Sequence, residues 1–186
     1  MIKLNLGCGT KKLDGWINVD HSSVGSPDVV LDLESTPWPW ETSSVDEIML
    51  HHVLEHLGRD TGVYLNIFKE IFRVCCNHAK ISIAVPHPRH DDFLNDPTHV
   101  RAITYDSLKL FDQAFNQRCI DKGWANTLLG MQMGIDLGME SVQVTLDPYW
   151  HKLWHSQQIT REALDQAIRS QNNVVKESRF VLRVRK

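Results

Sequence analysis

Residues 4–10 read Leu4-Asn5-Leu6-Gly7-Cys8-Gly9-Thr10, a short apolar strand that runs directly into a loop with two glycines. Four more short apolar runs follow, at residues 16–19, 29–31, 45–50 and 80–85. A helix is predicted between the last two runs, because apolar residues recur one helical turn apart from Ile67 to Cys75. Short apolar strands that alternate with helices are typical of a parallel α/β sheet.

The second half of the chain carries two more helix starts. Thr104 and Thr160 each precede an apolar pattern of helical period, and a threonine in that position caps a helix N-terminus. Two late strands are predicted at residues 142–146 and 180–184. No repeat and no linker interrupts these patterns, so we expect a single domain over residues 1–186.

The composition narrows the class of protein. The chain has 186 residues, and its 42% of hydrophobic residues excludes a mainly disordered chain. A net charge of −3 gives no basic footprint and no apolar run is long enough to cross a bilayer, so we expect no nucleic-acid and no membrane partner. The four cysteines form no C-x-x-C pair and no secretory signal is recognised, which favours reduced thiols in the cytoplasm.

The ends of the predicted strands carry the residues that could bind a ligand: Gly7-Cys8-Gly9, Asp20, Asp32-Leu33 and His51-His52. In an open parallel α/β sheet, ligands bind outside the carboxyl ends of the strands. Glycines allow the backbone to approach a ligand closely. An acid after the second strand can bind both hydroxyls of a ribose, and an acid after the third can meet an adenine edge. The three strand ends therefore describe a site for a nucleoside.

The same loop argues against a dinucleotide. A dinucleotide fingerprint needs a third glycine, and the corresponding position holds Lys12. Only 11 positions separate Gly9 from Asp20, which leaves no room for a full helix before the second strand. Without that helix N-terminus a pyrophosphate loses its usual anchor. The predicted ligand is a nucleoside without phosphates, and the first helix is short or missing.

In these motifs the chain resembles the class I S-adenosylmethionine-dependent methyltransferases, in particular the small type-11-like group. The resemblance covers most of residues 3–111 and rests on six stretches, at residues 4–9, 15–20, 28–33, 44–48, 52–57 and 72–74. It implies a Rossmann-like, doubly wound α/β fold, a three-layer sandwich with a mostly parallel sheet. The late strand pair fits the antiparallel end of that sheet.

The resemblance also implies roles for single residues, with S-adenosylmethionine as the cofactor. Gly7, Cys8 and Gly9 would line its methionine part, and Asp20 would hold the ribose hydroxyls. Asp32 and Leu33 would lie at the adenine, and His51 or His52 near the sulfonium. Asn5 stands where the family has an acid, so contact with the cofactor's ammonium group would pass through water or be made elsewhere.

Residues 86–101 and 147–159 are the candidate acceptor-side loops. In the first, His87, Asp96 or His99 would position or deprotonate a methyl acceptor, because histidine titrates near neutral pH. Two alternatives stay open for this loop: a solvated surface, or a metal held by His87-x-x-His90 together with Asp96 and His99. We rank the metal last and assign no metal ligand.

The sequence therefore predicts a methyltransferase that transfers a methyl group to an oxygen or nitrogen of a small-molecule or saccharide-like acceptor. One alternative is a catalytically idle Rossmann-like protein that binds S-adenosylmethionine or a protein partner. Another is a metal-dependent hydrolase that uses the histidine-rich loop.

Overall fold

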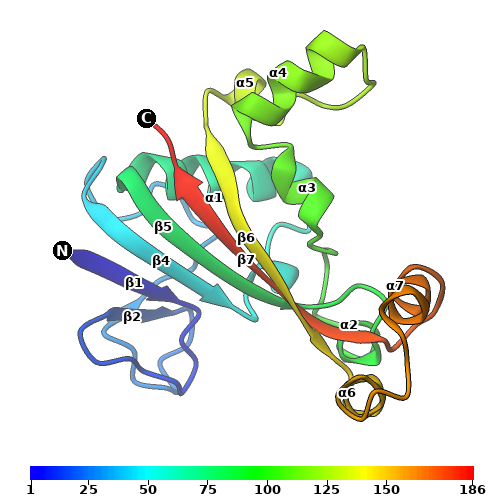
Figure 1. Ribbon diagram of the computed structural model, residues 1–186. Helices are drawn as coiled ribbons and strands as arrows, with labels where there is room; N and C mark the ends of the chain where they lie inside the picture. Colours follow the sequence, from blue (N-terminus) through cyan, green and yellow to red (C-terminus); the bar gives the residue numbers. More distant parts are fainter.

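A computed structural model describes all residues, 1–186. Its centre is one seven-stranded sheet with the strand order β3-β2-β1-β4-β5-β7-β6 (Figure 1). The strands β1 to β5 pair in parallel, and β7 runs antiparallel to both β5 and β6. Their bounds are β1 Ile2–Leu6, β2 Ile17–Asp20, β3 Val29–Val30, β4 Val45–His51, β5 Cys75–Pro86, β6 Leu137–Leu146 and β7 Val175–Val184. The expected fold class, a mostly parallel sheet with a late antiparallel pair and flanking helices, is confirmed.

The helices all follow β4 in the chain. They are the 3-10 helix η1 Leu54–His56 and the α-helices α1 Thr61–Val74, α2 Asp91–Leu94, α3 Tyr105–Lys109, α4 Gln113–Lys122, α5 Leu129–Met133, α6 Pro148–His155 and α7 Arg161–Ser170. Figure 1 shows α1 behind the sheet, with α3 to α5 extending from one end of the molecule and α6 and α7 at the other. No helix joins β1 to β2, β2 to β3 or β3 to β4, so these loops alone carry the chain past the ends of the first strands. No helix combines the length and the apolar character needed to cross a membrane.

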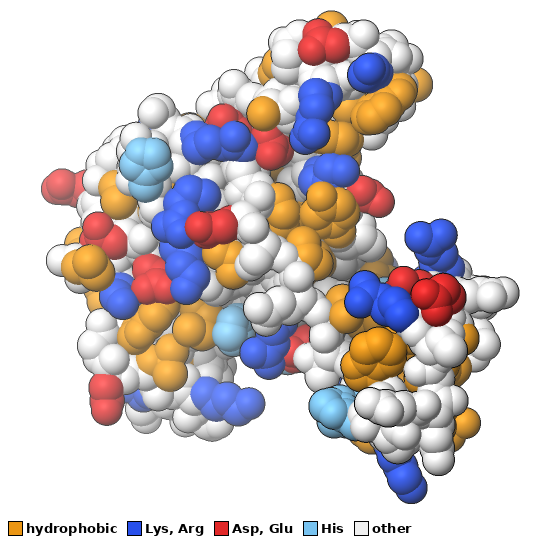
Figure 2. All heavy atoms as spheres, in the orientation of Figure 1, with side chains coloured by type: hydrophobic (Ala, Val, Ile, Leu, Met, Phe, Trp, Pro, Cys, Tyr) orange, Lys and Arg blue, Asp and Glu red, His pale blue; other side chains and the backbone are white.

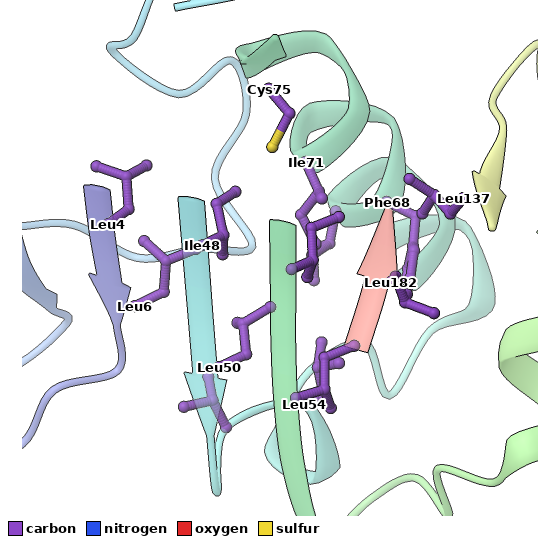
Figure 3. Close-up of a cluster of buried hydrophobic side chains, with 14 of the residues drawn as sticks. Leu4, Leu6, Ile48, Leu50, Leu54, Phe68, Ile71, Cys75, Leu137 and Leu182 are labelled. Carbon is purple, nitrogen blue, oxygen red and sulfur yellow. The ribbon is translucent and has the colours of Figure 1, made fainter. Parts of the chain in front are cut away.

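The main core lies between the sheet and α1. Asp60 caps this helix by accepting hydrogen bonds from the first-turn amides, and Ile67, Phe68 and Ile71 are fully buried on its inner side. Figure 3 shows Phe68 and Ile71 of α1 in one cluster with Leu4 and Leu6 of β1 and with Ile48 and Leu50 of β4. The ring of Phe68 also stacks on Phe111 with centroids 4.2 Å apart. Since a buried side chain of this size contributes roughly 1.5–3 kcal/mol, this layer fixes α1 to the sheet.

Several predicted elements have different bounds in the structure. The helix predicted to include Cys75 ends at Val74, and Cys75 already begins β5. The helix predicted from Thr104 is two helices, because the Asp112 carboxylate accepts hydrogen bonds from the amides of Ala114 and Phe115 and starts α4. Thr160 caps α7 as predicted. The second, fifth and late strands also have bounds that differ from the apolar runs.

One face of the sheet is solvated and carries charged side chains, which explains why the apolar runs of the sequence are shorter than several of the strands. Lys3, Glu47 and Lys80 are register partners on adjacent strands, and their side chains form ion pairs of 3.0 and 3.3 Å. Charged side chains of both signs are mixed over the face in Figure 2, without one broad patch of a single sign. These charged positions interrupt the apolar pattern although the backbone stays fully paired.

Candidate functional site

A pocket of about 870 Å³ opens at the carboxyl ends of the parallel strands. It is walled by the loops after β1, β2 and β3, by the end of β4 and by η1. Its lining residues are Gly7, Gly9, Asp20, His21, Leu31, Asp32, Leu33, Glu34, His52, Val53, His56, Leu57 and Thr98. Six of the nine residues expected at a cofactor, namely Gly7, Gly9, Asp20, Asp32, Leu33 and His52, therefore lie around one cavity.

The glycine loop is shaped by two left-handed residues. Gly7 has φ +68°, and a Cβ on it would lie 2.3 Å from Cγ2 of Val53. Gly9 has φ +52°, but no atom lies within 4 Å of the place where its Cβ would be. Gly7 thus serves a close packing contact, whereas Gly9 leaves open space at the wall of the pocket.

Asp20 ties the glycine loop to the end of β2. One carboxylate oxygen accepts a hydrogen bond of 2.8 Å from the Gly9 amide, and the other accepts one of 2.9 Å from the Ser22 amide. The residue is only 8% exposed, yet it lines the pocket. Each carboxylate oxygen has a second lone pair, so both remain able to accept a hydroxyl of a ligand.

The loop after β3 supplies a second acidic wall. Asp32 accepts hydrogen bonds from the Glu34 amide and the Ser35 hydroxyl, which shapes the turn. Glu34 in turn accepts a 2.7 Å hydrogen bond from the Gly58 amide, so this loop is joined to the segment after η1. Leu33 is buried and gives the wall an apolar surface next to these carboxylates.

His52 directly follows β4 and lies in the left-handed region, with φ +57°. Its Nε2 lies 2.9 Å from Oε2 of Glu177, and its Nδ1 lies 3.5 Å from Oε1 of Glu55. The Glu55 carboxylate, joined by that of Glu177, raises the pKa of His52. The imidazolium form is therefore stabilised at the floor of the pocket.

The charge of the lining distinguishes between classes of ligand. Asp20, Asp32 and Glu34 contribute three carboxylates, and no lysine or arginine lines the pocket. A phosphate group would be repelled by these carboxylates, and the His52 imidazolium is already paired with Glu177 at 2.9 Å, whereas phosphate sites normally use Arg, Lys or helix N-termini. The cavity is suited to a ligand with positive charge.

Three residues expected at the cofactor lie outside the lining. The Asn5 side-chain amide donates hydrogen bonds to the Lys11 carbonyl and to Oδ1 of Asn18, so it fixes the glycine loop to β2. Cys8 is buried, and burial raises the pKa of its thiol. His51 is not among the lining residues, and partial burial together with Arg179 lowers its pKa.

The candidate acceptor-side residues do not line the pocket either. The His87 ring accepts a hydrogen bond from the Arg89 amide, and burial lowers its pKa. His90 caps α2 through the Asp92 amide. Asp96 accepts two hydrogen bonds from Thr98, which lower its pKa, and His99 packs beneath that turn with 8% of its side chain exposed. The alternative metal set of His87, His90, Asp96 and His99 does not form; His99 lies instead with Glu55 and His56.

The segment 147–159 is a helix rather than a loop over the pocket. Asp147 caps α6, and Trp150 packs against the small core formed by Leu164, Ala167 and Val174. Nothing between residues 147 and 159 contributes to the lining.

Sequence reasoning missed several lining residues, among them His21, Glu34, His56 and Thr98. Glu34 was within reach, because it directly follows Asp32-Leu33 at a strand end. Thr98 carries no local signal: it reaches the pocket only because the 98–101 segment is bound to η1. The amides of Val100 and Arg101 both donate to the Glu55 carbonyl, at 2.8 and 3.2 Å.

Known structures share this architecture. An S-adenosylmethionine-dependent methyltransferase from Archaeoglobus fulgidus aligns with a TM-score of 0.62 and 18% identity, over 97% of this chain and 85% of that chain. One from Methanosarcina mazei aligns with a TM-score of 0.55 and 14% identity, over 97% and 91%. The chain has the fold of these methyltransferases. No protein-family model and no curated protein matches its sequence.

This methyltransferase fold is also found in a protein described as a cyclase. That structure aligns with a TM-score of 0.55 and 11% identity, over 98% of this chain and 74% of that chain. One fold can carry several reactions, so the function has to be argued from the site itself.

Proposed function

We propose that the chain is an S-adenosylmethionine-dependent methyltransferase that acts on an oxygen or nitrogen of a small-molecule or saccharide-like acceptor. One observation carries the proposal: the glycine loop, Asp20 and the Asp32-Leu33 turn surround a single acidic pocket that has no lysine or arginine. S-adenosylmethionine is a nucleoside without phosphates, and its sulfonium and ammonium groups outweigh its one carboxylate. Its net positive charge matches the lining.

Each part of the pocket has a task in this proposal. The open space at Gly9 admits the methionine part against the backbone, and the second lone pairs of Asp20 accept the ribose hydroxyls. Leu33 supplies apolar contact for the adenine, beside the Asp32 turn. Methyl transfer from sulfonium to a nucleophile is an in-line displacement in which the cofactor supplies the reactivity. The protein contributes proximity, alignment and exclusion of water.

The acceptor class follows from the free part of the same pocket. The three carboxylates of the lining repel a polyanionic acceptor, whereas a hydroxyl group of a sugar or a small metabolite can donate to Glu34, the carboxylate that the cofactor does not use in this proposal. His87, Asp96 and His99 lie outside the lining, so this proposal gives none of them the role of base.

A second candidate is a protein of this fold that binds the cofactor without turning it over. The absence of a helix between β1 and β2 favours it, because that connection is reduced to a loop. Binding of cofactor without formation of S-adenosylhomocysteine, across a panel of sugars and small hydroxyl or amine acceptors, would select this candidate over the first.

Calorimetric titration with S-adenosylmethionine tests the binding step. We expect saturable binding by the wild-type chain, a loss of about tenfold or more in Asp20→Asn, and unchanged binding in Asp106→Asn, whose side chain is 88% exposed far from the pocket. Asp20→Asn keeps the size of the side chain and removes its charge. Equal affinities for the two variants, or no binding by the wild type, would refute the proposal.

A further inference from the structure

Three potential metal ligands converge beside the pocket. Glu55 and His56 lie in η1, and His99 lies in the segment that follows α2. One ligand atom from each comes within 4.8 Å of the others. His56 also lines the pocket, so the cluster borders the space assigned to the substrate.

Glu55 is a buried carboxylate without a hydrogen-bond donor. The residue is 1% exposed, and neither Oε1 nor Oε2 has a hydrogen-bond partner. The nearest cationic group is Nδ1 of His52, 3.5 Å from Oε1, and His52 forms its shorter contact, of 2.9 Å, with Glu177. A buried charge of this kind is costly unless it is paired or coordinates a metal.

The hydrogen bonds around His56 fix which of its two ring nitrogens is engaged. The Thr98 hydroxyl donates its proton to Asp96, because a carboxylate oxygen 2.6 Å away can only accept. The Thr98 oxygen is therefore an acceptor for Nδ1–H of His56, at 2.9 Å. Nε2 is therefore the ring nitrogen of His56 that makes no hydrogen bond within the chain.

His99 has the same arrangement. Its Nδ1 lies 2.9 Å from the Phe93 carbonyl and donates to it, which leaves Nε2 without a hydrogen bond, 3.7 Å from Oδ2 of Asp96. The ring is held in place by stacking on Phe93 and by an edge contact with His56, at centroid distances of 5.4 and 4.6 Å. Metal-binding histidines almost always donate their other ring N–H to a carbonyl, carboxylate or similar group, which fixes the tautomer in this way.

We propose that Glu55, His56 and His99 bind a divalent transition-metal ion such as Zn²⁺. Two imidazoles and one carboxylate are a ligand set of catalytic zinc sites, which keep a further position open for water or substrate. At bond lengths of about 2.1 Å, tetrahedral ligand atoms lie roughly 3.4 Å apart, so modest side-chain rotation closes the observed cluster. The open position would face the pocket, because His56 is part of its wall.

The competing explanation is that Glu55 serves only as the counter-ion of His52. A metal-binding measurement distinguishes this role from that of a metal ligand. Full-length protein is treated with EDTA, dialysed into metal-free buffer and titrated with Zn²⁺ alone by calorimetry. We expect one Zn²⁺ per chain, and a loss of affinity of about 100-fold or more in Glu55→Gln and in His99→Ala. Binding of Co²⁺ in place of Zn²⁺ would give the absorption bands of a nitrogen- and oxygen-ligated ion.

The chain contains a matched control. His151 and His155 lie side by side on α6 with ring centroids 4.1 Å apart, an exposed pair that can bind metal adventitiously. The double variant His151→Ala/His155→Ala should leave the Zn²⁺ stoichiometry and affinity unchanged. The proposal is overturned if the wild type binds no stoichiometric Zn²⁺, or if the α6 variant abolishes binding while Glu55→Gln and His99→Ala retain it.

Thr98 offers a second test that does not remove a ligand. Thr98→Val loses the hydroxyl that orients His56 and should weaken Zn²⁺ binding by about 10- to 100-fold, whereas Thr98→Ser should restore it. Equal Zn²⁺ affinity in Thr98→Val and Thr98→Ser would contradict the assigned tautomer of His56. This readout keeps the proposal testable if Glu55→Gln does not fold.

The consequence for catalysis rests on the proposed methyltransferase function. A metal at this position would coordinate an acceptor hydroxyl and lower its pKa, which favours oxygen as the methylated atom. Zn²⁺ binding without cofactor binding would refute the methyltransferase proposal alone, and cofactor binding without Zn²⁺ binding would refute the metal site alone.

Discussion

Gly7→Ala and Gly9→Ala should rank in opposite order for the loss of stability and for the loss of ligand binding. An alanine at either position must adopt a left-handed backbone, at about 1–2 kcal/mol. In Gly7→Ala the new methyl would also lie 2.3 Å from Cγ2 and 3.0 Å from Cγ1 of buried Val53, and overpacking of this kind costs about 1–3 kcal/mol. We expect Gly7→Ala to lose about 2–5 kcal/mol of unfolding free energy, against about 1–2 for Gly9→Ala.

The assay is urea unfolding followed by circular dichroism, on the two single variants, on Val53→Ala and on Gly7→Ala/Val53→Ala. Trimming Val53 makes room for the new methyl, so the double variant should be more stable than additivity predicts by about 1 kcal/mol or more. Additive losses, or equal losses for Gly7→Ala and Gly9→Ala, would refute the assigned contact.

Ligand binding should follow the reverse order. The methyl of Gly9→Ala enters the open space of the pocket, whereas that of Gly7→Ala is directed at Val53. Under the proposed function, Gly9→Ala should therefore weaken S-adenosylmethionine binding while costing less stability. Wild-type affinity in Gly9→Ala would remove its backbone from the cofactor site.

Three further predictions concern the scaffold. The Arg73 guanidinium lowers the pKa of buried Glu70 below its ordinary value of 4.5. The pair therefore adds stability above pH 4.5, and this stability is lost as the pH falls through the lower pKa of the folded state. The unfolding free energy of Glu70→Gln should lack this part of the pH dependence, and a pH profile equal to that of the wild type would contradict the coupling. Phe111→Ala removes the ring stacked on Phe68 and should cost about 3–5 kcal/mol in denaturant unfolding, with a loss under 1 kcal/mol counting against the packing. Burial raises the pKa of Cys75 to about 12, so its thiol should not react with a thiol reagent at pH 8. The native Cys75→Ser variant should therefore be labelled as fast as the wild type, and slower labelling of the variant would show that the Cys75 thiol is accessible.

The strands that build the pocket were predictable because their signals are local. Each apolar run of β1 to β4 ends in a glycine, an acid or a histidine, and parallel pairing brings those ends to one edge. The full lengths of β5 and β7 were hidden, because Cys75 continues the helical pattern that precedes β5, and Lys176, Glu177 and Arg179 interrupt the first half of β7. Their backbone pairing, rather than an apolar run, sets where these strands end.

The direction of single side chains was not predictable from position alone. Asn5 and Cys8 sit in the motif but lie beneath the loop, because Asn5 is bound to Asn18 and Cys8 is buried in the packing under Gly9. In a strand, successive side chains point to opposite faces, so neighbours in a motif need not share a cavity. Asp147 likewise caps a helix that leads away from the pocket.

The sequence by itself determined the α/β fold, the edge of the sheet at which the pocket lies and the glycines and acids that line it. Only the tertiary structure decided which histidines meet. His56 and His99 are 43 positions apart, and they come together because the amides of Val100 and Arg101 bind the Glu55 carbonyl and draw that segment onto η1. Strand ends are fixed by short-range pattern and pairing, whereas this convergence depends on the path of a loop, which no local pattern encodes.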